Sequence, residues 1–161
     1  MKHLYIFIIL CVLAIGLTSF KTFSDSEKYK CMIQMTNYSG EGAYIVISLI
    51  NPEGAYEKTL QVKGDDDEWY NTVESWWQFQ GKVRADLDAI TGATISGGER
   101  AISVIEIDND KLDKGYKLRF ESAVEDQEYY QDDVEFELTS QNLKSKINGN
   151  GFIRYIRMMP Q

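Results

Sequence analysis

The residues of this chain best placed to do chemistry through a side-chain oxygen form one run, Asp88-Ala89-Ile90-Thr91-Gly92-Ala93-Thr94. The second half of the run is small residues with two hydroxyls, and Gly97 and Gly98 follow it closely. Glycine permits backbone conformations that are closed to other residues, so we expect a loop with little bulk around Thr94. A large enzyme could then reach the Thr94 hydroxyl from outside. The alternative is a glycine-rich connection between a helix and a strand, capped by Thr91 or Thr94.

This run resembles the acceptor motif of the bacterial flavin transferases, which is an Asp, two variable residues, Ser or Thr, Gly, Ala, and a final Ser or Thr. The resemblance implies that the Thr94 hydroxyl attacks FAD and keeps FMN through a phosphoester bond. It also implies that Asp88, Thr91, Gly92 and Ala93 are the residues that the transferase recognises. The cofactor expected from the resemblance is therefore covalent FMN derived from FAD, and one expected partner is a flavin transferase.

The N-terminal residues predict export. Lys2 and His3 form a short positive start, and residues 4–20 carry no charge. We expect residues 1–24 to be a cleaved signal peptide. An uncleaved anchor is the alternative, since this uncharged run is at the short limit for a membrane-spanning helix. In both cases the positive-inside rule places the rest of the chain outside the cytoplasm, which makes the expected location periplasmic or otherwise extracytoplasmic.

Loss of this segment would leave few residue types for catalysis. The whole chain has 1 His and 2 Cys, and both His3 and Cys11 lie in the segment. A domain with only Cys31 and no His excludes an internal disulfide, a Ser–His–Asp triad, a Cys–His pair, a His-containing zinc site and His-ligated haem. We predict neither a metal site nor catalytic residues, so a redox centre would have to be held by other means.

The charge balance excludes a further class of function. Lys and Arg number 17 against 25 Asp and Glu, for a formal net charge of −8. An acidic surface repels phosphate backbones, so we do not expect a nucleic-acid partner. The C-terminus alone is locally basic, with Lys144, Lys146, Arg154 and Arg157. This region could dock on an acidic domain or on an anionic membrane surface, or it could be a charged edge strand.

Most of the chain has the pattern of short strands. Alternating or β-branched segments separated by turn signals predict strands at residues 31–36, 44–50, 56–62, 101–107, 116–124, 134–138 and 152–158. Such spacing is typical of an all-β fold, and we expect an immunoglobulin-like antiparallel β-sandwich with one short inserted helix. The expected flavin-carrying sandwich covers residues 25–143, and residues 144–161 form a C-terminal extension that contains the possible edge strand.

The inserted helix is predicted at residues 69–80. Five residues there recur at the spacing of one helical stripe, namely Trp69, Val73, Trp76, Trp77 and Gln80. We interpret Trp76 and Trp77 as the face on which the flavin ring stacks, because aromatic planes offer an offset-stacking surface. The alternative is that the tryptophans close one end of the sandwich core.

A wider resemblance covers residues 30–138. This part of the chain is similar to a family of predicted periplasmic domains of unknown function that are encoded near flavin transferases. The matching pieces are Trp76-Trp77, the acceptor run, Asp108-Asn109-Asp110 and Gly115-Tyr116. Members of that family often have Pro-Gly after the final Thr, where this chain has Ile95-Ser96-Gly97-Gly98.

These features predict an exported β-sandwich that carries FMN on Thr94 and passes electrons to or from a partner. The partner is expected to be membrane-bound, since electrons must come from the cytoplasm or the quinone pool. We favour an electron carrier over an enzyme because no general acid or base is in place for substrate turnover. The alternative function is a non-redox, immunoglobulin-like binding or scaffold module in which the Thr-Gly-Ala-Thr loop is structural.

Overall fold

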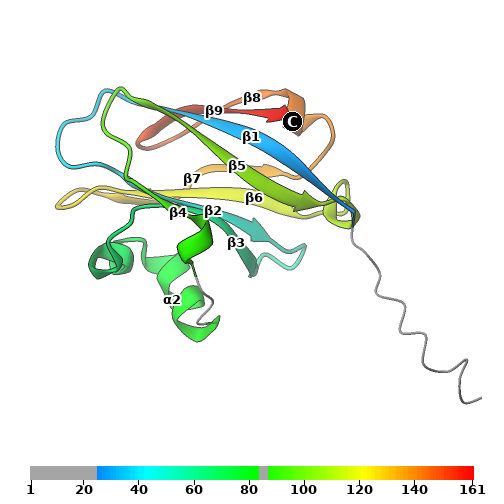
Figure 1. The fold of residues 1–161 in the computed structure, drawn as a ribbon, viewed down its shortest axis with the longest axis horizontal. Coiled ribbons are helices and arrows are strands. Elements are labelled where there is room, and N and C mark those ends of the chain that lie inside the picture. The colour runs from blue at the N-terminus through cyan, green and yellow to red at the C-terminus, as the bar shows by residue number, and fades with distance from the viewer. Residues whose placement is uncertain (1–24, 84–86) are drawn as a thin grey trace, which may run out of the picture.

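The computed structural model describes residues 25–83 and 87–161, which form two β-sheets packed face to face (Figure 1). The four-stranded sheet has the order β5-β1-β9-β8, and the five-stranded sheet has the order β4-β3-β2-β6-β7. The strands are β1 Ser26–Met35, β2 Tyr44–Ile50, β3 Tyr56–Lys63, β4 Thr91–Gly92, β5 Arg100–Asp108, β6 Lys117–Ala123, β7 Tyr129–Glu137, β8 Lys146–Asn148 and β9 Ile153–Pro160. All pairings are antiparallel except the short one between β3 and β4.

The predicted all-β sandwich with one short α-helix is confirmed for the described residues. Every predicted strand has its counterpart, and the strand at residues 44–50 has the predicted bounds. Strand β1 begins at Ser26, five residues before the expected start, because the alternation of buried and exposed side chains extends back through Tyr29. Strands β4 and β8 were not predicted, since two or three residues are too short to show a period.

The main hydrophobic core lies between the two sheets. Alternate residues of β1 point inward, among them the fully buried Cys31, Ile33 and Met35. They meet the inward residues of the facing sheet, which include Ile47 and Phe120. Strand β2 is buried on both of its faces, because the helical insertion covers the side of its sheet that points away from the sandwich (Figure 1).

The helical insertion has two parts, a 3₁₀ segment η1 at Asp67–Thr72 and the α-helix α2 at Glu74–Val83. Val73 and Trp76 are fully buried and pack with Val46 and Val62 in a second, smaller core. The indole Nε1 of Trp76 donates a hydrogen bond of 2.9 Å to Thr59 Oγ1 on β3. The insertion is therefore fixed to the sheet that carries β3 and β4.

The C-terminal residues are an integral part of the sandwich. Residues 144–161, expected to be an extension with an edge strand, supply β8 at the sheet edge and β9 in its interior, between β1 and β8. The buried Asp133 of β7 accepts hydrogen bonds from the backbone N–H groups of Asn150, Gly151 and Ile153, at 2.7–3.0 Å. These bonds join the loop before β9 to the other sheet, so the sandwich needs the C-terminal strands for its core.

Candidate functional site

The run at residues 88–94, here called the acceptor run after the motif that it resembles, lies along the edge of the five-stranded sheet. It begins with the 3₁₀ turn η2 at Asp88–Ile90 and continues as β4, which pairs with Val62 and Lys63 of β3. Within this run the Thr91 hydroxyl donates to the Leu87 carbonyl at 2.8 Å, so Thr91 closes the turn. The side chain of Asp88 lies outside the described residues.

After β4 the chain leaves β3 and crosses to Ala43, just before β2. Ile95 and Ala43 form an isolated antiparallel bridge, in which the distances from backbone N to backbone O are 2.9 and 3.1 Å. The Tyr38 hydroxyl accepts from the Ala43 N–H at 2.8 Å and donates to the Ile95 carbonyl, so it joins the same two residues. Thr94 directly precedes this double connection, which fixes the position of its backbone.

The turn that follows Thr94 explains two of the glycines. A Cβ on Gly97 would overlap the backbone of Tyr38, and Gly98 has a φ of +79°, a left-handed conformation that favours glycine. The Gly98 N–H donates to the Thr36 carbonyl at 2.7 Å. Ile95-Ser96-Gly97-Gly98 therefore forms a compact turn held against the loop after β1.

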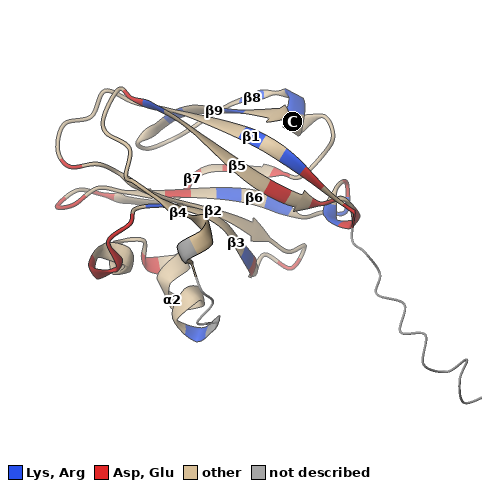
Figure 2. Cartoon of the chain, in the orientation of Figure 1, with Lys and Arg blue, Asp and Glu red and all other residues tan. Residues whose placement is uncertain are grey.

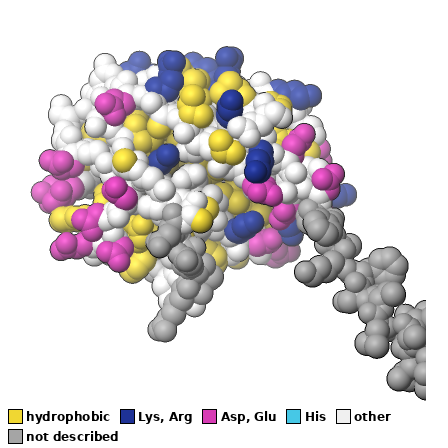
Figure 3. All heavy atoms as spheres, in the orientation of Figure 1, with side chains coloured by type: hydrophobic (Ala, Val, Ile, Leu, Met, Phe, Trp, Pro, Cys, Tyr) yellow, Lys and Arg dark blue, Asp and Glu magenta, His cyan; other side chains and the backbone are white. Residues whose placement is uncertain are grey.

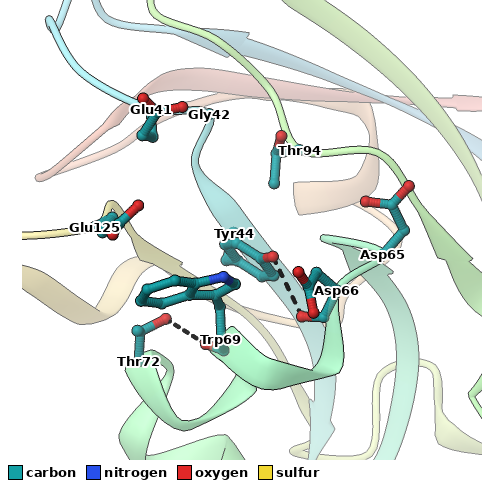
Figure 4. A pocket seen from close by; sticks show the side chains of 9 residues that line it. All are labelled: Glu41, Gly42, Tyr44, Asp65, Asp66, Trp69, Thr72, Thr94 and Glu125. Atoms are coloured by element: carbon teal, nitrogen blue, oxygen red, sulfur yellow. Dashed lines mark hydrogen bonds between the residues drawn. The ribbon is translucent and has the colours of Figure 1, made fainter.

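Thr94 borders an open cavity of about 180 Å³ (Figure 4). Thr94 and Gly42 form one wall, and the Trp69 ring lies on the opposite side with Tyr44 between them. Trp69 is 36% exposed, and its carbonyl accepts a hydrogen bond of 2.7 Å from the Thr72 hydroxyl. The site therefore combines a side-chain hydroxyl and an aromatic face, both reachable from solvent.

Gly42 leaves no room for a side chain beside Thr94. A Cβ at position 42 would lie 2.7 Å from Thr94 Cβ and closer still to Thr94 Oγ1. Among the described residues Thr94 Oγ1 makes no hydrogen bond, whereas the hydroxyls of Thr91 and Thr72 are both engaged. Thr94 is thus the threonine of this region whose hydroxyl is left available.

The cavity is acidic. Four of its nine lining residues are carboxylates and none is Lys or Arg; the carboxylates are Glu41, Asp65, Asp66 and Glu125. Burial and the nearby Asp66 and Asp65 raise the pKa of the Tyr44 hydroxyl, which donates to the Asp66 carbonyl at 3.2 Å. The site therefore has a negative potential, and Tyr44 stays neutral and protonated in it.

The structure brings Thr94 together with a tryptophan, but not with the two that the sequence suggested. Trp76 is fully buried against β3, and Trp77, 38% exposed, does not line the cavity. The buried Trp76 offers no face to a ligand, and it packs in the second core on the outer side of the five-stranded sheet rather than at one end of the sandwich core. Trp69 takes the place beside Thr94 because η1 has three residues per turn, which brings Tyr70 rather than Trp69 into line with Val73.

Comparison with known families gives a match over most of the chain. The family described as "Predicted periplasmic protein (DUF2271)" matches residues 26–155, which include the acceptor run. The match passes residue 138, where the resemblance was expected to end, and continues into β9. No curated protein and no solved structure matches the chain. No helix within residues 25–83 and 87–161 is long and apolar enough to cross a membrane.

Proposed function

We propose a function for a chain that belongs to the family of predicted periplasmic proteins (DUF2271): it is an exported flavoprotein that relays electrons outside the cytoplasm. In this proposal FMN is attached covalently to Thr94 through a phosphoester bond. A flavin transferase attaches the cofactor, and a membrane-bound redox protein exchanges electrons with it. Residues 1–24, which lie outside the described residues, direct export.

The observation that carries the proposal is the availability of the Thr94 hydroxyl. It borders an open cavity and has no hydrogen-bond partner among the described residues. The Thr91 hydroxyl, three positions before Thr94 in the same run, already donates a hydrogen bond to the Leu87 carbonyl. Of the two threonines in the acceptor run, Thr94 is therefore the one that can act as a nucleophile without first breaking a hydrogen bond within the described chain.

Attachment of the flavin requires only that the chain expose the Thr94 hydroxyl to the transferase. Thr94 Oγ1 forms a bond to the FMN-side phosphorus of FAD while the bond between the two phosphates breaks. AMP leaves with that electron pair, and the hydroxyl proton passes to a base of the transferase. The bridge between Ala43 and Ile95 holds the backbone next to the nucleophile, and the absence of a side chain at Gly42 leaves its rotamer free of overlap.

FMN bound at this position would supply one- and two-electron redox chemistry. The exposed ring of Trp69 offers a stacking face across the cavity from Thr94, a contact worth about 0.5–1.5 kcal/mol. The cavity, at about 180 Å³, is smaller than the roughly 300–1,000 Å³ of pockets that enclose ligands of drug size. Part of the flavin would therefore stay exposed at the surface, as transfer of electrons to a second protein requires.

The carboxylates around the cavity would set how readily the bound flavin accepts electrons. Glu41, Asp65, Asp66 and Glu125 oppose the accumulation of negative charge beside Thr94. We therefore expect a midpoint potential below that of free FMN. Replacing Asp65 and Asp66 by Asn should raise the potential, and the difference should shrink at high salt because these groups are near solvent.

The test is co-expression of the full chain with a flavin transferase. The protein should be yellow, fluoresce after denaturation, and gain the mass of FMN less one water. Thr94→Ser should keep all three properties and Thr94→Ala should lose them. Thr72→Ala is the matched control, since Thr72 lines the same cavity, and it should stay flavinylated. Flavin on the Thr94→Ala protein would place the attachment elsewhere, and a wild-type protein that never acquires flavin would favour a non-redox binding module.

A further inference from the structure

The outer face of the four-stranded sheet differs in charge from the rest of the protein. Its strands alternate between core and solvent, and their paired registers bring fifteen outward positions onto one surface. These positions, here called the outer face, are Ser26, Lys28, Lys30, Met32 and Gln34 of β1, Arg100, Ile102, Val104, Glu106 and Asp108 of β5, Tyr155, Arg157 and Met159 of β9, and Lys146 and Asn148 of β8. Five of them are Lys or Arg and two are acidic, in a chain with 17 basic and 25 acidic residues.

Apolar side chains lie among these bases. Ile102 is 57% exposed and Val104 is 46% exposed, and together they make up half of the large exposed hydrophobic residues of the described chain. The register places Met32 opposite Ile102 and Lys30 opposite Val104, so the apolar and basic residues alternate within one patch. Figure 3 shows basic side chains along the top of the molecule with hydrophobic ones between them, and acidic side chains at the lower left and at the right.

We infer that the outer face binds an anionic lipid bilayer. Peripheral membrane binding combines basic residues that meet anionic headgroups with apolar residues that enter the boundary of the acyl chains, and the outer face has both. The face extends over the four strands β5, β1, β9 and β8. It lies on the sheet that does not contain β3 and β4, so binding would leave the Thr94 cavity uncovered (Figure 1).

The sequence before β1 supports a lipid partner. The uncharged run at residues 4–20 ends six residues before Ser26, where β1 begins. Six residues span at most about 20 Å when fully extended. Wherever that run is retained in a bilayer, the start of β1 therefore lies within about 20 Å of the lipid surface. Lys28 and Lys30 of the outer face lie on the same strand, two and four residues after its start.

The test is co-sedimentation with lipid vesicles. Residues 25–161 contain both sheets and both hydrophobic cores of the described chain, so we expect this part to fold by itself and use it without the uncharged run. It should bind vesicles of phosphatidylcholine mixed with phosphatidylglycerol and not vesicles of phosphatidylcholine alone. Binding should weaken as salt is raised, because the screening length falls from about 10 Å at 0.1 M salt to about 3 Å at 1 M.

Charge reversal tests the location of the binding surface. Each basic residue near an anionic membrane strengthens binding about fivefold, so Lys30→Glu combined with Arg157→Glu should weaken it by at least about 25-fold. The matched control is Lys82→Glu combined with Lys114→Glu, two exposed bases outside the outer face that change the net charge equally. The control should lose only a few-fold in affinity. Equal losses in the two double variants would overturn the assignment to this face.

A second pair of variants tests the apolar contribution without a change of charge. Ile102→Thr combined with Val104→Thr keeps residues that favour strands and should weaken binding by about fivefold. Absence of binding to the anionic vesicles, or equal binding to neutral ones, would overturn the inference. So would self-association of the wild-type protein, seen by sedimentation equilibrium, that the Lys30→Glu and Arg157→Glu pair abolishes, because the occupant would then be a second copy of the chain.

Discussion

Gly42→Ala alters the surroundings of Thr94, the proposed attachment site, without changing Thr94 itself. The added Cβ would lie 2.7 Å from Thr94 Cβ, and ordinary contacts of this kind begin at 3.4 Å, so the overlap is 3.4 − 2.7 = 0.7 Å. Gly42 does not have a positive φ, so alanine adds no backbone strain of its own. The Thr94 side chain must therefore move or rotate by a comparable amount. A displacement of about 1 Å can cost about 100-fold in rate, and we expect flavin attachment to slow by about tenfold or more.

The assay is a time course of in-gel flavin fluorescence with the chain, a flavin transferase and FAD. Gly81→Ala is the matched control, because a Cβ at Gly81 would meet nothing within 4 Å. It should be modified at the wild-type rate and stabilise α2 by up to about 1 kcal/mol. Overpacking should cost the Gly42→Ala protein about 1–3 kcal/mol, so circular dichroism must show that it is folded. A folded Gly42→Ala protein that is modified at the wild-type rate would refute the reasoning.

Three further predictions concern the fold. Trp76→Ala should lower the free energy of unfolding by about 3–5 kcal/mol in urea titrations, because the Trp76 side chain is fully buried. Trp77→Ala should lower it much less, because Trp77 is 38% exposed. Equal losses of stability in the two variants would contradict the burial of Trp76. Burial raises the pKa of Glu121 above 4.5, so folding favours its protonated form and wild-type stability falls as pH rises from about 4.5 through the raised pKa. The stability gained by Glu121→Gln over wild type should therefore grow with pH across that window, and a constant difference would count against it. Burial also raises the pKa of Cys31 to about 12, so its thiol should react with Ellman's reagent at pH 8 only after unfolding.

Most strands of the fold could be predicted from the sequence because the signals for strands are local. The strand at Tyr44–Ile50 is a continuous apolar and β-branched run closed by a turn, and its bounds were predicted correctly. The tryptophan stripe was less informative, because five matching positions do not distinguish one α-helix from a 3₁₀ segment followed by a helix. That difference decides whether Trp69 or Tyr70 is buried, and so which aromatic ring faces Thr94.

The acceptor run could be found from the sequence, but its surroundings could not. The cavity is lined by residues from four separate segments, at 41–44, 65–72, 94 and 125. Only the folded chain brings Glu125 and Trp69 near Thr94 (Figure 4). The acidic run at 65–68 was visible in the sequence, yet nothing local indicates that Asp65 and Asp66 border the site. The same holds for the outer face, whose bases come from four strands and lie along β1, β5, β8 and β9 (Figure 2).

The most direct test is the intact mass of the protein isolated from its own host, followed by fragmentation of the peptide that contains Thr94. A polypeptide heavier by one FMN less one water, with the added mass on the Thr94 side chain, is the result expected of a flavin-carrying relay. An unmodified polypeptide from cells that make an active flavin transferase in the same compartment would contradict it.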